Sequence, residues 1–99
     1  MPPLLATVAS DDFSVTAYFS VHAQADPGVM PRVLELFAKR GLVPSAWQSR
    51  VFGTDQAELT MEIQMRGLGR ELIDYIAACL RQIACVEVVL TSERCLASA

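Results

Sequence analysis

The order in which two hydrophobic periodicities follow one another is the feature that most limits the fold of this chain. Apolar and polar residues alternate strictly over residues 13–23, which predicts a half-buried strand. After the turn residues 24–28, apolar residues recur at helical spacing over 29–37. Gly41 stands where the residue after a helix adopts the left-handed conformation, so this helix should end near Arg40.

The same two periodicities return in the second half of the chain. Residues 42–52 predict a second strand, and Pro44 favours an edge position because proline cannot donate to a strand ladder. A hairpin turn then leads to a third, alternating strand over 58–65. Residues 72–83 place their apolar side chains on one face of a second helix, and the β-branched run 85–91 predicts a fourth strand.

The predicted element order is therefore β-α-β-β-α-β. With right-handed crossovers this order gives an α/β (α+β) fold of the ferredoxin-like type, a four-stranded antiparallel sheet with two helices on one face. The first and third strands are central in that topology, so the second strand lies at an edge, as Pro44 suggests independently. We expect one domain over residues 13–91, with flexible tails at 1–12 and 92–99.

The inward positions of these elements define the predicted core. It consists of Phe13, Val15, Phe19, Val21, Val33, Leu34, Phe37, Leu59, Met61, Ile63, Leu72, Ile73, Ile76, Leu80, Val86 and Val88. The opposite face of the sheet should be polar and somewhat acidic, with Tyr18, Ser20, His22, Glu58 and Glu62.

Composition favours a small packed domain that associates with other chains. Of the 99 residues, 53% are hydrophobic and 19% charged, far from the composition of disordered chains. A domain of this length buries a smaller fraction of its surface than a larger one. We therefore expect at least a homodimer.

Charge and spacing exclude several classes of function. The net charge of −3 and the scattered basic residues argue against nucleic acid, and the carboxylates of Glu58 and Glu62 would repel phosphate. Three cysteines without a Cys-x-x-Cys spacing predict neither a disulfide framework nor a metal site. No apolar run approaches the roughly 20 residues that span a bilayer. The expectation is a cytoplasmic protein without cofactor, metal or membrane contact.

One enzymatic alternative comes from a short loop. Residues 27–32 resemble the phosphate-binding loop of acylphosphatases, which have this fold and size. That resemblance implies an arginine at Arg32 that holds phosphate and an asparagine that orients water. The chain contains no asparagine, and Pro31 removes a loop amide, so the expectation is that the protein is not an enzyme.

A wider resemblance covers most of the chain. Residues 19–23, 26–30 and 32–41 resemble the signature of the ACT domain, a strand followed by x-P-G-hydrophobic and then R-V-x-x-L-F-x-x-R-G. The likeness is greatest to the acetolactate synthase small subunit, whose last helix-to-strand junction residues 83–88 also resemble. The resemblance implies a regulatory subunit in branched-chain amino-acid biosynthesis, with a large catalytic subunit as its partner. A stand-alone amino-acid-binding module is the alternative that it leaves open.

The resemblance also implies a ligand site at the start of the first helix, where backbone amides would face the carboxylate of an amino-acid effector. Its residues would be Ala25, Asp26, Pro27, Gly28, Val29, Met30 and Val43. In this chain Ala25 and Val43 replace the polar anchors of amino-acid-binding members, which favours regulation without feedback. The simpler interpretation is that Asp26 caps the helix and Pro27 sets the turn.

The resemblance implies, finally, that two copies pair side by side through the second strand and the first helix. The interface residues on the strand would be Ser45, Trp47, Ser49 and Val51. Pairing would cover the free amides and carbonyls of an edge strand, which otherwise favour uncontrolled association. Trp47 fits such an interface because tryptophan is enriched at binding hot spots, although a place in the core suits it equally.

Overall fold

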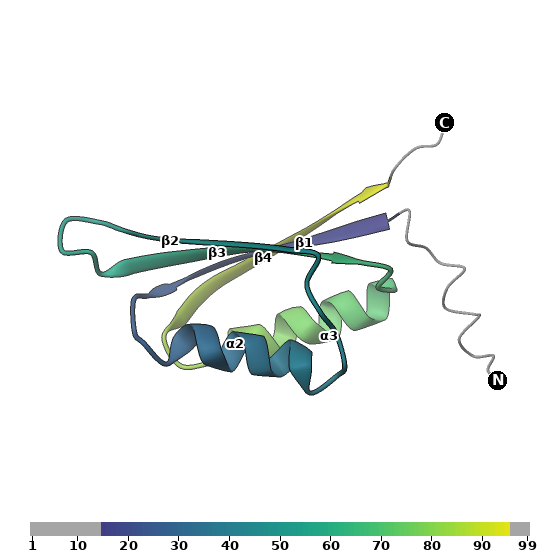
Figure 1. The fold of residues 1–99 in the computed structure, drawn as a ribbon, viewed down its shortest axis with the longest axis horizontal. Helices are drawn as coiled ribbons and strands as arrows, with labels where there is room; N and C mark the ends of the chain where they lie inside the picture. The colour runs from purple at the N-terminus through teal and green to yellow at the C-terminus, as the bar shows by residue number, and fades with distance from the viewer. Residues whose placement is uncertain (1–14, 96–99) are drawn as a thin grey trace.

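The structure is a computed structural model that describes residues 15–95. Its elements in chain order are β1 (Val15–Gln24), α2 (Val29–Ala38), β2 (Ala46–Phe52), β3 (Glu58–Arg66), α3 (Arg70–Arg81) and β4 (Val86–Cys95). The strands form one antiparallel sheet in the order β2-β3-β1-β4. Both helices lie on the same side of the sheet (Figure 1). The predicted ferredoxin-like fold, with β1 and β3 central, is confirmed.

The core lies between the sheet and the helices. Phe19 of β1 and Phe37 of α2 meet edge to face, with ring centroids 5.8 Å apart. Most of the predicted core residues are buried, namely Phe19, Val21, Val33, Phe37, Leu59, Met61, Ile63, Ile73, Ile76 and Leu80. Val15, Leu72 and Val86 are partly buried, and Phe13 lies outside the described residues. Alternation along the central strands therefore identified the core correctly.

Leu34 was wrongly predicted to be in the core, since it is 47% exposed. Helix α2 turns Val29, Val33 and Phe37, spaced by four residues, toward the sheet. Leu34 follows Val33 by about 100° of helical rotation, which takes it out of that row. Because the crossover from β1 to β2 is right-handed, it places β2 to one side of α2. Because the helix is also right-handed, the rotation from Val33 to Leu34 takes Leu34 to that same side, toward the β2 edge.

Val88 was also wrongly predicted to be in the core, because β4 contains a β-bulge. Val88 pairs with His22, whereas the next residue of β1 pairs with Val86. Glu87 is therefore an extra residue that breaks the alternation along β4. As a result Val89 is buried, while Val88 lies on the outer face of the sheet with an exposed fraction of 45%.

The ends of three elements differ from the predictions. Strand β2 begins at Ala46, so the four residues before it, including Pro44, precede the strand. Strand β4 continues to Cys95, so residues 92–95 of the predicted tail belong to the sheet. Helix α2 ends at Ala38, and Gly41 has the predicted left-handed backbone, with φ of 71°.

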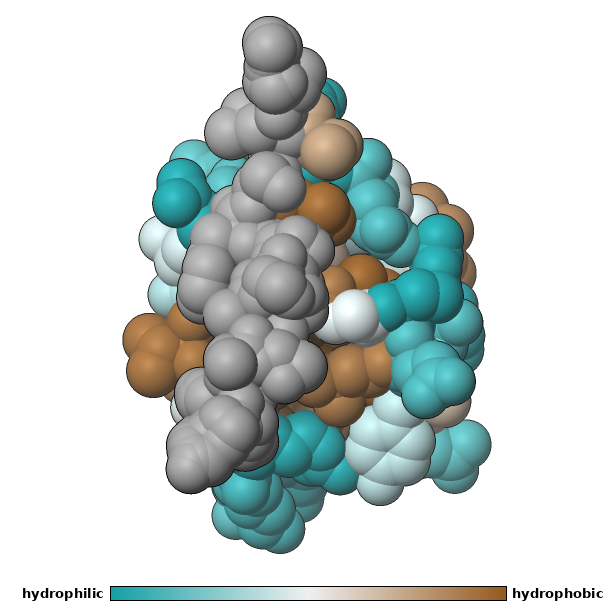
Figure 2. All heavy atoms as spheres, turned by 90° about the vertical axis from the view of Figure 1, so that its right-hand side faces the viewer, coloured by the Kyte–Doolittle hydropathy of each residue, from teal (hydrophilic) through white to brown (hydrophobic). Residues whose placement is uncertain are grey.

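Seen from the end where β3 leads into α3, brown apolar patches interrupt the hydrophilic surface (Figure 2).

Candidate functional site

The loop between β1 and α2 is held by its own backbone. The amide of Ala25 donates to the carbonyl of Ala57 at 2.8 Å, which ties the loop to the start of β3. The amide of Asp26 donates to the carbonyl of Gln24 at 2.8 Å. These bonds give the loop one conformation before helix α2 begins.

The carboxylate and carbonyl of Asp26 take up two of the amides that the resemblance assigns to a ligand, those of Gly28 and Val29. The amide of Gly28 donates to Oδ1 of Asp26 at 2.8 Å, and the amide of Val29 donates to its backbone carbonyl at 3.0 Å. This is an Asx-type turn, in which an aspartate satisfies the backbone that follows it. A ligand carboxylate would have to displace Asp26 to reach the Gly28 amide.

Gly28 has room for a side chain of limited size. Its φ of −84° is one that any residue adopts. A Cβ atom added there would lie 3.0 Å from Nη1 of Arg32, whose exposed guanidinium folds back over the loop. Because the end of an arginine side chain moves easily, the position does not require glycine for steric reasons.

An open pocket of about 600 Å³ lies beside this loop. Ala25, Asp26 and Pro27 line it, as predicted site residues, and Glu58 and Glu87 add two further carboxylates. Among residues 15–95, no basic side chain lines it. Three carboxylates therefore line the pocket, and each would repel the carboxylate of an amino acid.

Val43 is not brought to this loop within one chain. It lies in the connection from α2 to β2, with an exposed fraction of 84%, whereas the loop precedes the other end of the helix. Helix α2 has 10 residues, so its two ends are about 15 Å apart. Val29 and Met30 begin the helix, the first buried and the second partly buried against the core.

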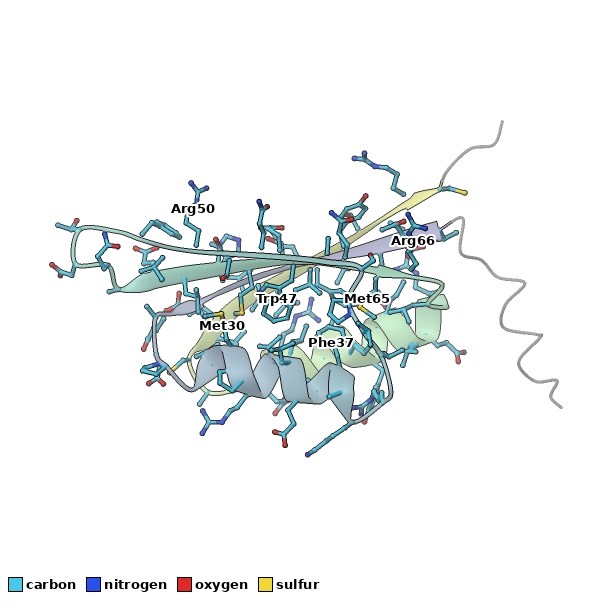
Figure 3. The ribbon with its side chains drawn as sticks, in the orientation of Figure 1. Met30, Phe37, Trp47, Arg50, Met65 and Arg66 are labelled. Carbon is cyan, nitrogen blue, oxygen red and sulfur yellow. The ribbon has the colours of Figure 1, made fainter. Side chains whose placement is uncertain are left out.

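The predicted interface residues of β2 share the face of the sheet that the helices cover. Trp47 pairs with Ile63 and is partly buried against the core, in the layer between sheet and helices where Met30 also lies (Figure 3). Ser49 and Val51 are on the same side but exposed. Ser45 precedes the strand, and its hydroxyl donates to the carbonyl of Gln64 at 3.2 Å.

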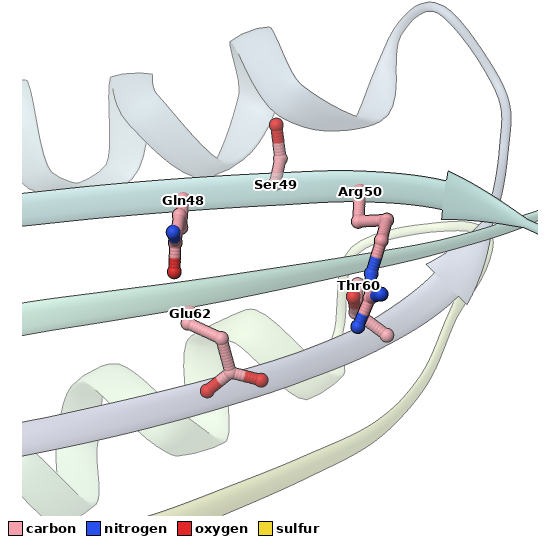
Figure 4. A pocket seen from close by; sticks show the side chains of 5 residues that line it. All are labelled: Gln48, Ser49, Arg50, Thr60 and Glu62. Atoms are coloured by element: carbon pink, nitrogen blue, oxygen red, sulfur yellow. The ribbon is translucent and has the colours of Figure 1, made fainter.

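The other face of β2 carries two polar residues that the sequence analysis did not single out, Gln48 and Arg50. Gln48 and Arg50 line an open pocket of about 400 Å³ together with Thr60 and Glu62 of β3 (Figure 4). Arg50 projects from the outer side of the sheet, away from the helices (Figure 3). The alternation of β2 could have identified this second face, because neighbouring residues of a strand point to opposite sides.

The centre of the outer face holds a short polar network. The hydroxyl of Ser20 donates to Oε2 of Glu62 at 2.8 Å, and Nε2 of His22 lies 3.4 Å from the same hydroxyl. Among residues 15–95, no three histidine, cysteine, aspartate or glutamate side chains cluster as metal ligands. No helix in this part of the chain is long and apolar enough to cross a membrane.

The two edges of the sheet differ in their protection. At β4, Nη2 of Arg81 donates to the carbonyl of Val89 at 2.8 Å, and Arg70 forms an ion pair with Glu93 at 2.7 Å. Both arginines belong to α3, so this helix occupies backbone and side-chain groups of the edge strand. None of the three ion pairs among residues 15–95 involves β2. The β2 edge is thus the less protected one.

Comparison with known families gives one match over nearly the whole chain. The family model of the ACT-like domain matches residues 10–97. No curated protein matches the sequence.

Three solved structures illustrate the similarity of the fold to known proteins. The ACT domain of GTP pyrophosphokinase from Chlorobium tepidum has a TM-score of 0.65 at 11% identity, covering 80% of this chain and 88% of that one. The C-terminal domain of MgtC from Mycobacterium tuberculosis has a TM-score of 0.62 at 16% identity, covering 90% and 97%. The regulatory subunit of aspartate kinase from Thermus flavus has a TM-score of 0.56 at 17% identity, covering 81% and 52%. At these identities the likeness shows the fold alone.

Proposed function

Because this chain belongs to the ACT-like domain family, we propose that it is a cytoplasmic regulatory subunit that pairs with itself and binds a larger enzyme, without cofactor or catalysis of its own. The observation that carries this proposal is the hydrogen bonding and charge of the loop before α2. Asp26 occupies the Gly28 amide, and the adjoining pocket is lined by three carboxylates. Regulation through contact with a partner suits such a loop better than regulation by a bound amino acid.

Self-association through β2 and α2 is supported by exposed apolar side chains. Val51 and Phe52 of β2 are 44% and 37% exposed, and Leu34 lies on the flank of α2 directed toward this edge. Apolar side chains gathered on an unprotected edge strand favour pairing with a second strand. The opposite edge is covered by Arg81 and Arg70, so β2 is the strand available for pairing.

The proposed partner is the large subunit of an acetolactate synthase-type enzyme. Support comes from the resemblance of residues 26–30 and 32–41 to the small subunit of that enzyme. The regulatory subunit of aspartate kinase, which shares the fold, illustrates this use of the architecture. In the proposed assembly the chain would activate its partner without feedback from valine.

The partner can be tested by affinity capture of the full chain from its native cell, with captured proteins identified by mass. Acetolactate synthase activity of the captured large subunit is then measured with and without this chain. Enrichment of that subunit and several-fold activation are expected. Capture of a different enzyme, or unchanged synthase activity on adding the chain, would contradict the assignment of the partner.

The alternative, a stand-alone amino-acid-binding module, is favoured by the open pocket beside Ala25. Calorimetry separates the two, because this alternative requires saturable binding of an amino acid by the isolated chain. The hydrolase interpretation has less support, since the amides of Gly28, Val29 and Arg32 are already bonded and no asparagine is available to orient water.

A further inference from the structure

We propose that two copies pair their β2 strands antiparallel in the register centred on Ser49, and that Arg50 of each copy then forms an ion pair with Glu62 of the other. This inference rests on the proposed homodimer and specifies its register and the charges that select it. Strand β2 runs from Ala46 to Phe52, so Ser49 is its midpoint and the whole strand is paired.

The exposed apolar residues of β2 favour this register. In a two-fold antiparallel pair, residues equidistant from the centre lie opposite each other on the same face. In the register centred on Ser49, Val51 of one copy lies opposite Trp47 of the other, on the side of the sheet that the helices cover. On the outer side Phe52 meets Ala46. Both exposed apolar side chains of β2 thus gain apolar neighbours.

A register centred one residue earlier, on Gln48, is poorer. Val51 would then lie opposite Ser45, and Arg50 would lie opposite Ala46. Neither exposed apolar residue of β2 would meet an apolar partner within the strand. Moving the centre of the pairing by one residue along β2 therefore changes every cross-strand pair at the interface.

The charges favour the same register. Gln48 pairs with Glu62 within one chain, on the outer face of the sheet. Around Ser49, Arg50 of the second copy lies opposite Gln48, and hence two strand spacings, about 10 Å between Cα atoms, from Glu62. That separation is within the combined reach of an arginine and a glutamate side chain. The two-fold axis repeats the contact, giving two ion pairs in each dimer.

Arg50 and Glu62 have no ion-pair partner in the part of the chain that the structure describes. None of the three ion pairs formed by residues 15–95 includes Arg50 or Glu62, although both line the same outer pocket (Figure 4). The hydroxyl of Ser20 holds one oxygen of Glu62 by a hydrogen bond of 2.8 Å. The second copy would supply the cation next to this positioned carboxylate.

Charge reversal in the full chain tests the pairing. Arg50→Glu alone, or Glu62→Arg alone, places like charges in both contacts, and each should weaken the homodimer about tenfold in sedimentation. Mixing the two variants should give heterodimers with the affinity of the unmodified chain, detected by native mass spectrometry. Arg94→Glu, on the outer face of β4, should leave the dimer unchanged. Failure of the mixed variants to pair preferentially would overturn the proposed ion pairs.

Cysteine cross-linking tests the register independently of charge. In a Cys95→Ala background, Ser49→Cys should form a disulfide across the two-fold axis, because Ser49 is the residue of β2 that lies opposite its own copy. The Cβ atoms of opposite residues are about 4.5–5.5 Å apart, which a small backbone adjustment brings to the roughly 3.5–4.5 Å of a disulfide. Gln48→Cys should not. A dimer that cross-links through Gln48→Cys instead would overturn the register and leave the proposed homodimer intact. A monomer at high micromolar concentration would overturn the homodimer itself.

Discussion

The Oδ1 atom of Asp26 lies 2.8 Å from the backbone nitrogen of Gly28. The chain's own carboxylate therefore occupies the position at the start of α2 that an effector's carboxylate would take in the site implied by the family resemblance. The loop is therefore ordered by hydrogen bonds within the chain and does not need a bound ligand to hold its conformation.

Valine, leucine and isoleucine should not bind measurably to the unmodified chain. Asp26 blocks the Gly28 amide, and Glu58 and Glu87 repel a carboxylate in the adjoining pocket. Isothermal calorimetry should give heats equal to those of dilution. Micromolar affinity for any of the three would contradict this account.

Replacing Asp26 with alanine should destabilise the chain modestly. The substitution removes the side-chain bond to Gly28, a loss of about 0.5–1.5 kcal/mol. Urea unfolding followed by circular dichroism measures the change, with Asp55→Ala in the β2–β3 turn as a control of equal charge. If both variants unfold at the same midpoint, the Asp26 bond contributes nothing to stability.

Phe19 should be among the most costly residues to truncate. It is fully buried and meets Phe37 edge to face, so Phe19→Ala should lower the free energy of unfolding by about 3–5 kcal/mol. Leu90→Ala, at an exposed position of β4, should change it by less than about 0.5 kcal/mol. An unchanged denaturant midpoint for the Phe19 variant would place this residue outside the core.

Two neighbouring valines of β4 should lose unequal amounts of stability on the same substitution. Val89→Thr buries a hydroxyl and should cost about 1–3 kcal/mol, whereas Val88→Thr should cost less than about 0.5 kcal/mol. The difference arises from the bulge at Glu87, which turns Val89 inward and Val88 outward. The reverse order of thermal midpoints would show that β4 lacks this bulge.

Arg81 should stabilise the chain more than Arg70. Its guanidinium donates to the carbonyl of Val89 in a partly buried setting, so Arg81→Met should cost about 1.5–3 kcal/mol. The ion pairs of Arg70 with Asp74 and Glu93 are largely exposed, and Arg70→Met should cost about 0–1 kcal/mol. Chemical unfolding of the two variants side by side measures the difference. Equal losses would mean that Arg81 does not protect the β4 edge as described.

Local patterns were sufficient to predict the element order and most of the core. The alternation of β1 and β3 places every second side chain inward whatever the neighbouring strand, so Phe19 and Met61 could be assigned from the sequence. The left-handed Gly41 followed in the same way, from the need to end a helix. These are properties of a few consecutive residues and do not depend on the register between distant strands.

Tertiary structure alone decided the features that depend on pairing between distant segments. The bulge at Glu87 exists only in the register of β4 against β1, and it reversed the assignment of Val88. The exposure of Leu34 depends on the rotation of α2 about its own axis relative to the sheet. The contact of Arg81 with Val89 depends on how α3 packs beside β4. Each of these is settled by burying the most apolar surface across all elements at once, which a periodicity within one element does not specify.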